Sequence, residues 1–502
     1  MKFKLPYSSQ NWVSLIGATI ALISLFMIGF LFFISLFLGQ GGLYLGLVIY
    51  IMLPAVLIAG LILIPLGMLL TVRKERRIGK VEQPPWPRID LNDSRHRNGF
   101  FIFLFGTTVF LFLSALGSYE AFHFTESVQF CGTLCHHLME PEYTAYQHSP
   151  HAKVACVECH VGPGADWYVR SKLSGAYQVY ATIFNKYPRP IPTPIKNLRP
   201  ARVVCEQCHW PQKFYAHKLR YETHYLPDKE NTQWDIRLIM KIGAEHSALG
   251  LKEGIHWHIN TNIKIQYVSP SENVEDIPWV RSINLATRDT VVYRDENNEI
   301  SDREVDSLTI HTMDCIDCHN RPSHNYRPPA IFINEAMTAG EIPKDLPEIK
   351  SISMEFLDRE YSTTDSALMS IKEGITNFYR ENYKDIYNNK KDVIEKAITG
   401  VQNSFSKNIF PEMRVRWDAY PNHIGHQEFK GCFRCHDGSH LAQNKQVIPK
   451  NCNLCHLISA QGTPGKMEIA KVGEALDFKH PVDIDEAWRE MLCTECHTGV
   501  NP

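Results

Sequence analysis

The longest apolar feature of the chain is a run from Asn11 to Val72 that contains no Asp, Glu, Lys, Arg or His. A membrane-spanning helix needs about 20 apolar residues, so the run is long enough for two. A glycine-rich break at 39–42 divides it into segments near 12–38 and 43–70. The pattern therefore predicts a transmembrane helical hairpin within residues 1–71.

A third apolar run extends from Gly99 to Gly117 and predicts a third transmembrane helix over 99–122; a buried core helix is the alternative. The connecting segment 72–98 is rich in basic residues, and basic loops stay in the cytoplasm. With three spans, the chain after residue 122 lies outside the cytoplasm, in the periplasm. The basic residues of this loop are Arg73, Lys74, Arg76, Arg77, Lys80, Arg88, Arg95 and Arg97.

The polar remainder of the chain contains short periodic segments. Strand character occurs at Trp257–Val268 and at Thr290–Ile300. Apolar residues recur at helical spacing from Leu368 to Phe378, after a cap-like Ser362-Thr363-Thr364-Asp365, and Gly400 can close a following helix. These segments predict a mainly helical or irregular domain with a small β insert at about 250–300.

All 14 cysteines occur in pairs whose second member is followed at once by histidine. We number the pairs as sites 1 to 7 in chain order. They are Cys131/Cys135-His136, Cys156/Cys159-His160, Cys205/Cys208-His209, Cys315/Cys318-His319, Cys432/Cys435-His436, Cys452/Cys455-His456 and Cys493/Cys496-His497.

This pattern is the attachment signature of c-type haem, in which two thioether bonds hold the porphyrin and the next histidine ligates iron. Zinc knuckles and disulfides are the rival interpretations, but neither needs a histidine after every pair. The sequence therefore predicts seven covalently bound haems c. Haem also supplies apolar surface around which the chain packs, so we expect a cofactor-dependent fold.

A six-coordinate haem needs a second axial ligand, and 15 further histidines follow residue 122. Those that lie near a motif or in a local cluster are the candidates, with His256 competing with His258 and His423 with His426. The candidates are His148, His224, His258, His311, His324, His426, His440 and His480.

The spacing of the motifs divides the chain beyond the third apolar run. Sites 1 to 4 fall within a haem domain at 123–330, a helical spacer follows at 331–420, and sites 5 to 7 lie in a C-terminal segment at 421–502. Together with the apolar runs, this predicts a membrane-anchored multihaem c-type cytochrome.

Site 1 has three residues between its cysteines, where the other sites have two. Either His136 still ligates iron, or Met139 or an external group does so. Because site 1 follows the third apolar run, it is the natural contact point for a lipid-soluble electron donor. Asp166 and Lys172 could relay the protons that quinol oxidation releases; the alternative is that both are solvated or interfacial side chains.

Of 52 basic and 54 acidic residues, ten and five precede residue 123, which leaves the haem-bearing part at net −7. Haem propionates add negative charge. A partner protein with a basic docking surface is therefore favoured over nucleic acid.

Residues 99–215 carry a family resemblance. An apolar helix leads into Phe130-Cys131 and Cys135-His136, and Met139, Pro141-Glu142-Tyr143 and Cys156-Val-Glu-Cys159-His160-Val161 follow. These motifs resemble the NapC/NirT/NrfH family of membrane tetrahaem quinol dehydrogenases. The resemblance implies a first haem at the membrane surface that takes electrons from menaquinol. It also implies that Met139 is the methionine of the first motif and Lys172 the quinol-site lysine. The first motif is one residue longer here than in the family.

As a whole, the chain is similar to the inner-membrane heptahaem cytochromes of dissimilatory metal-reducing bacteria. The similarity implies a quinol dehydrogenase that draws on the menaquinone pool, contacts membrane lipid, and passes electrons to periplasmic c-type cytochromes in anaerobic respiration. Two alternatives remain open at this point: an anchored electron-conduit subunit without its own quinol site, and a terminal reductase of a small oxyanion.

Overall fold

The structure is a computed structural model that describes residues 9, 11–37, 53–78, 90–133, 136–162, 165–193, 199–243 and 254–500. The chain forms two compact units, Met1–His136 and His137–Pro502. The first unit contains the long apolar helices and the site 1 motif, and the second contains sites 2 to 7.

The first unit contains an antiparallel pair of helices, α1 (Trp12–Phe37) and α3 (Leu53–Ile78). Gly17 of α1 faces Gly60 of α3, and a Cβ on Gly17 would lie 2.7 Å from the Gly60 carbonyl oxygen. The Ser14 hydroxyl donates to the Ile64 carbonyl oxygen at 2.9 Å. Small residues thus let the two backbones approach closely, as is common between membrane helices. The predicted helical hairpin is present, although its glycine-rich turn lies outside the described residues.

The prediction of three membrane spans is wrong in number. Within the described residues, two helices are long and apolar enough to cross a membrane, at Trp12–Gly29 and Leu53–Lys74. The third apolar run lies inside α4 (Ser94–Glu126), a 33-residue helix with Arg95, His96 and Arg97 in its first turn and Glu120 and His123 near its end. Helix also replaces both ends of the expected loop at 72–98, because α3 continues to Ile78 and α4 begins at Ser94.

Helices and short 3-10 turns carry or flank the first haem motifs. In chain order they are α5 (Val128–Thr133), α6 (His136–Gln147), α7 (Cys156–His160), α8 (Ala165–Ile183), α9 (Ala201–Cys205), η3 (Pro211–Lys213), η5 (Ile255–Ile259), α10 (Asp302–Ser307) and α11 (Cys315–Cys318). The later motifs lie among short 3-10 helices, which are η6 (Pro411–Met413), η7 (Trp417–Ala419), η8 (Gly431–Arg434), η9 (Cys452–Leu454), η10 (Ala487–Arg489) and η11 (Cys493–Glu495).

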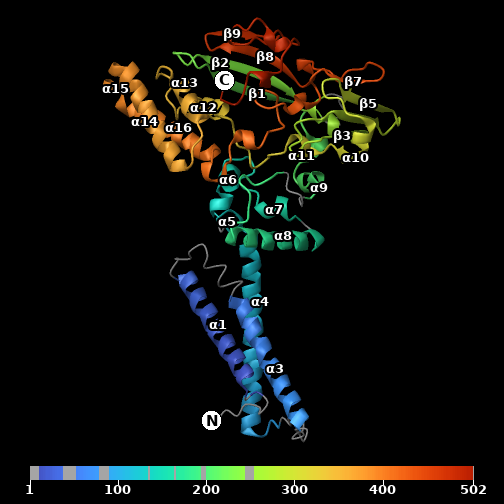
Figure 1. The fold of residues 1–502 in the computed structure, drawn as a ribbon, viewed down its shortest axis with the longest axis vertical. Coiled ribbons are helices and arrows are strands. Elements are labelled where there is room, and N and C mark those ends of the chain that lie inside the picture. Colours follow the sequence, from blue (N-terminus) through green and yellow to red (C-terminus); the bar gives the residue numbers. More distant parts are fainter. Residues whose placement is uncertain are drawn as a thin grey trace. The chain divides into compact units, whose positions relative to one another are not determined.

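Two antiparallel sheets join distant parts of the second unit. The four-stranded sheet has the order β1 (His217–Tyr225), β2 (Gln233–Lys241), β8 (His456–Thr463), β9 (Lys466–Ile469), and unites green and red segments of the ribbon (Figure 1). The five-stranded sheet has the order β6 (His311–Thr312), β3 (Ile263–Val268), β4 (Trp279–Asn284), β5 (Thr290–Asp295), β7 (His440–Ala442).

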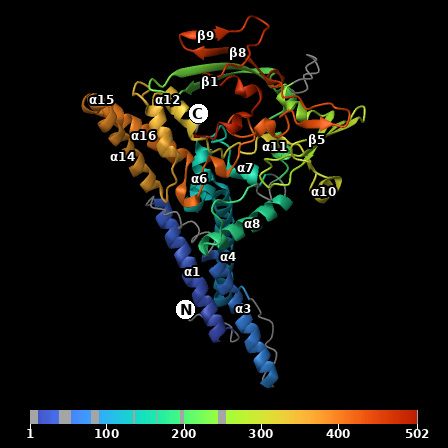
Figure 2. The ribbon, with the colours of Figure 1, turned by 45° about the horizontal axis from the view of Figure 1, so that its top comes forward.

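The β structure is more extensive than the expected insert at about 250–300. Strand β8 pairs with β2, with Met240 opposite His456, and β7 pairs with β5, with Tyr293 opposite Ala442. Figure 2 shows β8 and β9 together with β1 at one end of this unit. The C-terminal haem segment is therefore part of the same folded body as the middle of the chain.

A helical layer with its own apolar core separates site 4 from site 5 in sequence. It consists of α12 (Pro329–Thr338), α13 (Ile349–Asp358), α14 (Thr364–Asn382), α15 (Lys384–Asn389) and α16 (Lys391–Asn408). Thr363 caps α14 by accepting from the Ser366 amide, which confirms the expected cap. The side chains of Ile371 and Ile375 are fully buried in this core. These helices bury ordinary side chains against one another, so the expectation of a wholly haem-dependent fold is too broad.

Gly400 does not end a helix, as the sequence pattern suggested. It lies inside α16, where an added Cβ would approach the Glu341 carbonyl oxygen to 2.7 Å. The glycine therefore permits close packing of α16 against the segment that follows α12.

Candidate haem sites

The attachment turns share one local geometry. At sites 3, 4, 5 and 7 the amide of the motif histidine donates to the carbonyl oxygen of the first cysteine, at 2.8 to 3.0 Å. Such a turn brings residues three and four apart to neighbouring positions on one face. Both cysteines and the histidine can therefore contact the same bound group.

The second cysteines of sites 3 and 7 show how these turns hold their sulfur atoms. The Cys208 amide donates to the Cys205 carbonyl oxygen at 3.1 Å, and the Cys496 amide donates to that of Cys493, also at 3.1 Å. Both Cys208 and Cys496 are exposed free thiols. The backbone of each turn is thus fixed by its own hydrogen bonds, while the side chain stays accessible.

Five motif cysteines are exposed free thiols: Cys159, Cys208, Cys432, Cys452 and Cys496. A thioether joins the protein to the rim of a porphyrin, so a sulfur atom needs to reach only that rim and does not have to lie in the core. The role of these five cysteines in haem attachment stays a prediction, and their place in the turns supports it.

Six motif histidines face a second histidine across a nearly constant gap. Their ring centroids lie 5.8 to 6.3 Å apart. The pairs are His160 with His324, His209 with His151, His319 with His256, His436 with His258, His456 with His426, and His497 with His480.

These gaps fit an iron ion held between two imidazoles. A metal–nitrogen bond is about 2 Å and the ligating nitrogen lies roughly 1 Å from its ring centre, so two ligands on opposite sides of one metal have centroids about 6 Å apart. Histidine rings that merely pack against each other, with no metal between them, would not need to share one spacing. The donor set, two thioether-forming cysteines and two histidines, is that of a six-coordinate haem c.

Hydrogen bonds set the tautomer of five of these rings. Each uses Nδ1 to reach a backbone carbonyl oxygen, which can only accept, so Nδ1 carries the proton and Nε2 keeps its lone pair for a metal. The bonds join His151 to Pro322 (3.2 Å), His256 to Ile242 (3.0 Å), His258 to Ile255 (3.0 Å), His324 to Glu142 (3.0 Å) and His436 to Pro449 (2.9 Å).

Burial supports the same protonation state, because it penalises the charged imidazolium. It lowers the pKa of seven histidines of these pairs, in the case of His456 to about 4. The others are His160, His256, His258, His319, His426 and His436. A neutral ring at physiological pH is the form that binds a metal.

Four of the eight candidate distal ligands thus lie opposite a motif histidine, namely His258, His324, His426 and His480. The sequence reasoning missed His151, which follows the candidate His148 by three residues. It treated His256 only as a competitor of His258, although the structure pairs both. The sequence feature that could have identified His256 as a second candidate is its position two residues before His258.

The other four candidates have different surroundings. His440 donates from Nδ1 to Asp437 at 2.9 Å and from Nε2 to the Ile277 carbonyl oxygen at 2.7 Å, so neither nitrogen is available to a metal. His311 stacks on Tyr267 with centroids 5.3 Å apart.

His224 and His148 complete this group. The Nε2 of His224 lies 3.7 Å from a Glu222 carboxylate oxygen, and its Nδ1 lies 3.4 Å from the Asn334 amide nitrogen. His148 is exposed just beyond the end of α6. Neither faces a motif histidine within the described part of the chain, so we do not carry these four forward as ligands.

Site 1 is described only in part. Cys131 lies in α5, whereas Cys135 and the side chains of His136 and His137 lie outside what the structure describes. Met139 is half-buried in α6. Asp166 and Lys172 belong to α8, but their side chains are also outside the description, so their predicted quinol role remains a prediction.

Sites 2, 3 and 4 adjoin one another in chain order. Helix α7 of site 2 contacts α9 of site 3, and α9 contacts α11 of site 4. The Arg202 amide at the start of α9 donates to a carboxylate oxygen of Asp314, the N-cap of α11, at 3.1 Å. The attachment turns of these three sites therefore form one connected group.

The same succession continues to the C-terminus. His256 and His258, on the single turn η5, face sites 4 and 5. Phe433 of the site 5 motif stacks on His426 of site 6, with centroids 4.6 Å apart. The sulfur of Cys493 in site 7 lies 3.7 Å from Nδ1 of His426. Sites 2 to 7 thus adjoin in the order of the sequence.

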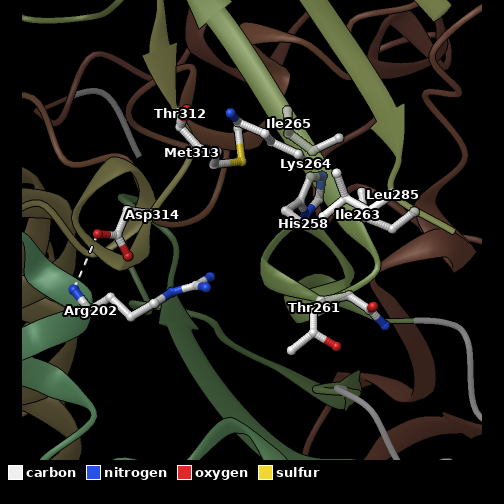
Figure 3. A pocket seen from close by; sticks show the side chains of 11 residues that line it. Arg202, His258, Thr261, Ile263, Lys264, Ile265, Leu285, Thr312, Met313 and Asp314 are labelled. Carbon is white, nitrogen blue, oxygen red and sulfur yellow. Dashed lines mark hydrogen bonds between the residues drawn. The ribbon is translucent and has the colours of Figure 1, made fainter. Parts of the chain in front are cut away.

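A cavity of about 370 Å³ opens beside His258 (Figure 3). Its walls combine Arg202 of α9, Lys264 of β3 and Asp314 before α11. It therefore lies where elements of sites 3, 4 and 5 meet. Arg202 and Lys264 are suited to pair with the propionate carboxylates of a haem.

Two apolar helices long enough to cross a membrane and a row of histidine-paired attachment sites define a membrane-anchored multihaem c-type cytochrome. Residues 93–190 match the model of the NapC/NirT cytochrome c family, N-terminal region. The chain is 42% identical to the cytochrome c-type protein ImcH of Geobacter sulfurreducens over 489 residues, which cover 97% of this chain and 95% of that protein. No solved structure matches the chain. The chain belongs to the NapC/NirT cytochromes c of the ImcH type.

Proposed function

We propose that this protein is a menaquinol-oxidising heptahaem cytochrome c that passes electrons from the membrane to periplasmic carriers in anaerobic respiration. The observation that carries the proposal is the row of six opposed histidine pairs at sites 2 to 7, because such a row suits electron transfer and leaves no open coordination position at those sites. Haem c, when bound, supplies a one-electron couple at iron.

The chain's own residues would hold that cofactor in three ways. The cysteines of all seven motifs would form the thioethers, and at sites 2 to 7 the motif histidine and the histidine that faces it would both ligate iron. Backbone carbonyls orient the rings through Nδ1, which keeps each Nε2 directed at the metal. Full six-coordination favours electron transfer over chemistry on a small oxyanion.

In this proposal quinol is oxidised at site 1. The family match spans residues 93–190, which include site 1, Met139, Asp166 and Lys172. In this proposal Lys172 orients the quinol oxygen, Asp166 accepts a proton, and Met139 contributes to the surroundings of the site 1 iron. Each quinol releases two electrons and two protons, and the electrons leave one at a time.

The haem-bearing unit is placed in the periplasm on chemical grounds, because c-type haem is attached outside the bacterial cytoplasm. With two apolar helices in place of three, the basic segment no longer supports this orientation by itself. A protease added to intact spheroplasts tests this orientation. Cleavage of the haem-bearing unit is the expected result, and full protection would show that this unit lies in the cytoplasm.

Reduction of the purified protein by a menaquinol analogue tests the proposal as a whole. The purified chain alone is expected to be reduced. Reduction only after a second protein is added would favour the alternative, an anchored conduit subunit without its own quinol site.

A further inference from the structure

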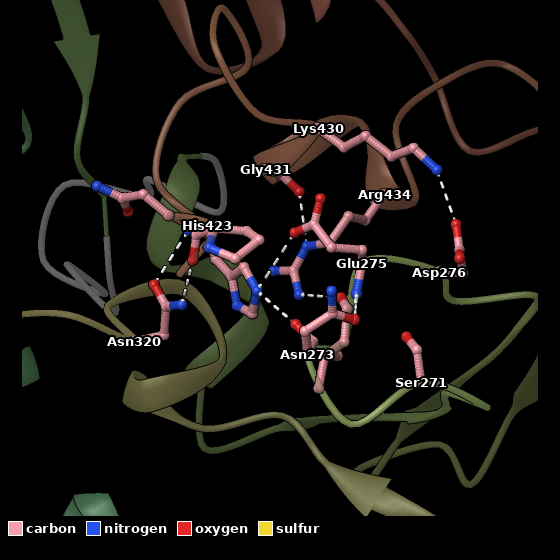
Figure 4. Close-up of polar contacts among 12 residues, drawn as sticks. Ser271, Asn273, Glu275, Asp276, Asn320, His423, Lys430, Gly431 and Arg434 are labelled. Atoms are coloured by element: carbon pink, nitrogen blue, oxygen red, sulfur yellow. Dashed lines mark hydrogen bonds and ion pairs between the residues drawn. The ribbon is translucent and has the colours of Figure 1, made fainter. Parts of the chain in front are cut away.

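Arg434 is a buried cation within an attachment turn. It lies between Cys432 and Cys435 of site 5 and is 7% exposed. Its guanidinium donates three hydrogen bonds to backbone carbonyl oxygens: Nε to Gly431 at 2.9 Å, one terminal nitrogen to Val274 at 2.9 Å, and the other to Asp317 at 2.7 Å (Figure 4). The planar fork is thereby fixed in orientation.

The third of these bonds reaches another attachment turn. Asp317 lies between Cys315 and Cys318 of site 4. Because the two cysteines of a motif hold the edge of one porphyrin, a residue between them lies beside that edge. One guanidinium therefore lies between the turns that carry the haems of sites 4 and 5.

Arg434 forms no ion pair with a carboxylate among the residues that the structure describes. Its three hydrogen-bond partners are neutral backbone carbonyl oxygens. Burial raises the pKa of the nearby Glu275 carboxyl, against the opposing charges of Arg434 and Lys430. Burial, and then the charge of Arg434, lower the pKa of His423 to about 4, so that ring is uncharged.

Two further acidic neighbours are bound to other groups. The Asp317 carboxylate accepts hydrogen bonds from the Tyr267 hydroxyl and the Asp314 amide. Lys430 pairs with Asp276 at 2.7 Å, and both side chains are substantially exposed to solvent (Figure 4). Arginine stays protonated at every physiological pH, so this site retains a fixed positive charge. Such a charge acts strongly where water is excluded.

We propose that Arg434 sets the reduction potentials of the haems at sites 4 and 5, and raises both by favouring the ferrous over the ferric state. Reduction adds one electron to each iron and lowers the local charge by one, which a nearby cation stabilises. The inference rests on haem occupancy of these two sites and on no assumption about quinol as donor. Arg434 is a positioning and tuning residue that touches no reacting atom.

The test is a spectroelectrochemical titration of the purified full chain, with haem number determined by mass spectrometry of the same preparations. Arg434→Gln removes the charge but keeps two donors. The expected result is a downward shift of two haem midpoints with the haem number unchanged, on the order of a tenfold change in the oxidised-to-reduced ratio, or about 59 mV for one electron. Arg434→Lys, which keeps the charge, is expected to restore the parental midpoints.

Lys430→Gln is the matched control, since it removes a neighbouring cation that is exposed and already paired, and its titration should equal that of the parent. Parental midpoints in a fully loaded Arg434→Gln variant would overturn the proposal. Loss of the same haem from both the Gln and the Lys variants would also overturn it. Arg434 would then hold two loops together and would not act through its charge. The titration uses electrode or dithionite electrons, so failure of quinol oxidation would not affect it.

Discussion

His256 and His258, two residues apart on one 3-10 turn, face the motif histidines of two different sites, His319 and His436. With three residues per turn, side chains two positions apart point in directions about 120° apart. A single short turn can therefore serve the haems on both sides of it. This turn connects the amino-terminal group of sites with the C-terminal group.

Replacing these two histidines one at a time should alter one haem each. His256→Ala is expected to leave site 4 without its second axial ligand, and His258→Ala to do the same at site 5. Electron paramagnetic resonance should then show one low-spin haem fewer in each variant and two fewer in the double variant. His311→Ala is the control, because that ring stacks on Tyr267 and faces no motif histidine. An unchanged spectrum for either single variant would contradict the assigned pairing.

Intact-mass spectrometry should find seven covalent haems on the chain. Each motif provides two thioether cysteines, so the expected added mass is that of seven haems. Site 1 is the sensitive point because its cysteines are one residue further apart. A stable count of six, unchanged by Cys131→Ala, would show that site 1 is not loaded.

Lys172→Ala should lower quinol-dependent reduction by roughly 10²-fold if this lysine takes part in proton transfer. Asp166→Asn should act in the same direction but more weakly, since another acid such as Glu142 can substitute. Stopped-flow reduction by a menaquinol analogue measures both. Haem content and reduction by dithionite should stay parental. Parental quinol rates in both variants would move the quinol site elsewhere.

Electron transfer from the acidic haem-bearing unit to a basic soluble cytochrome should slow as ionic strength rises. The Debye length falls to about 8 Å at physiological salt, which screens attraction between exposed charges. Flash-induced oxidation rates at several salt concentrations test this. Rates independent of salt would indicate an apolar or permanently attached partner.

The buried His440–Asp437 pair should make stability depend on pH. Burial opposes the charged ring, but its bond to Asp437 prevails and raises the pKa of His440 above 6.5, while bonds from His440 and Ser439 lower the pKa of Asp437 to about 2 against its burial. The histidine's contribution is therefore complete below pH 6.5 and lost as pH rises through its folded pKa. The carboxylate's contribution is present above pH 3.8 and lost as pH falls toward 2.

Thermal denaturation of His440→Gln measures this contribution. The variant should be less stable by about 1–2 kcal/mol between pH 4 and 6.5, and the difference should shrink at higher pH. A constant difference across the pH range would mean that the pair is not charged in the folded protein.

The attachment sites could be predicted from sequence because they depend on residues within a few positions of one another. The second ligands could not, because they depend on tertiary contacts. His440 was a reasonable candidate beside site 5, but the Ile277 carbonyl, 163 positions away, occupies the nitrogen that a metal would need. His148 and His151 are three positions apart, and the sequence does not show which of them lies opposite His209. In the structure it is His151.

The same distinction applies to the fold. The cap at Thr363 and the buried stripe of α14 follow local rules, and both were predicted correctly. Gly400 looked like a helix terminator, yet its role is a close approach to the Glu341 carbonyl, which no local pattern reveals. The pairing of β2 with β8 joins segments more than 200 residues apart, so the unity of the haem-bearing part could not be read from motif spacing.

The chain order of the histidine pairs has a consequence for maturation. At sites 3 to 7 the facing histidine precedes its own motif, so a chain exported amino end first presents both axial ligands as soon as that motif emerges. Site 2 is different, because His160 must wait for His324, 164 positions later. A chain whose export stopped between these two histidines would therefore expose the site 2 motif without the histidine that faces it.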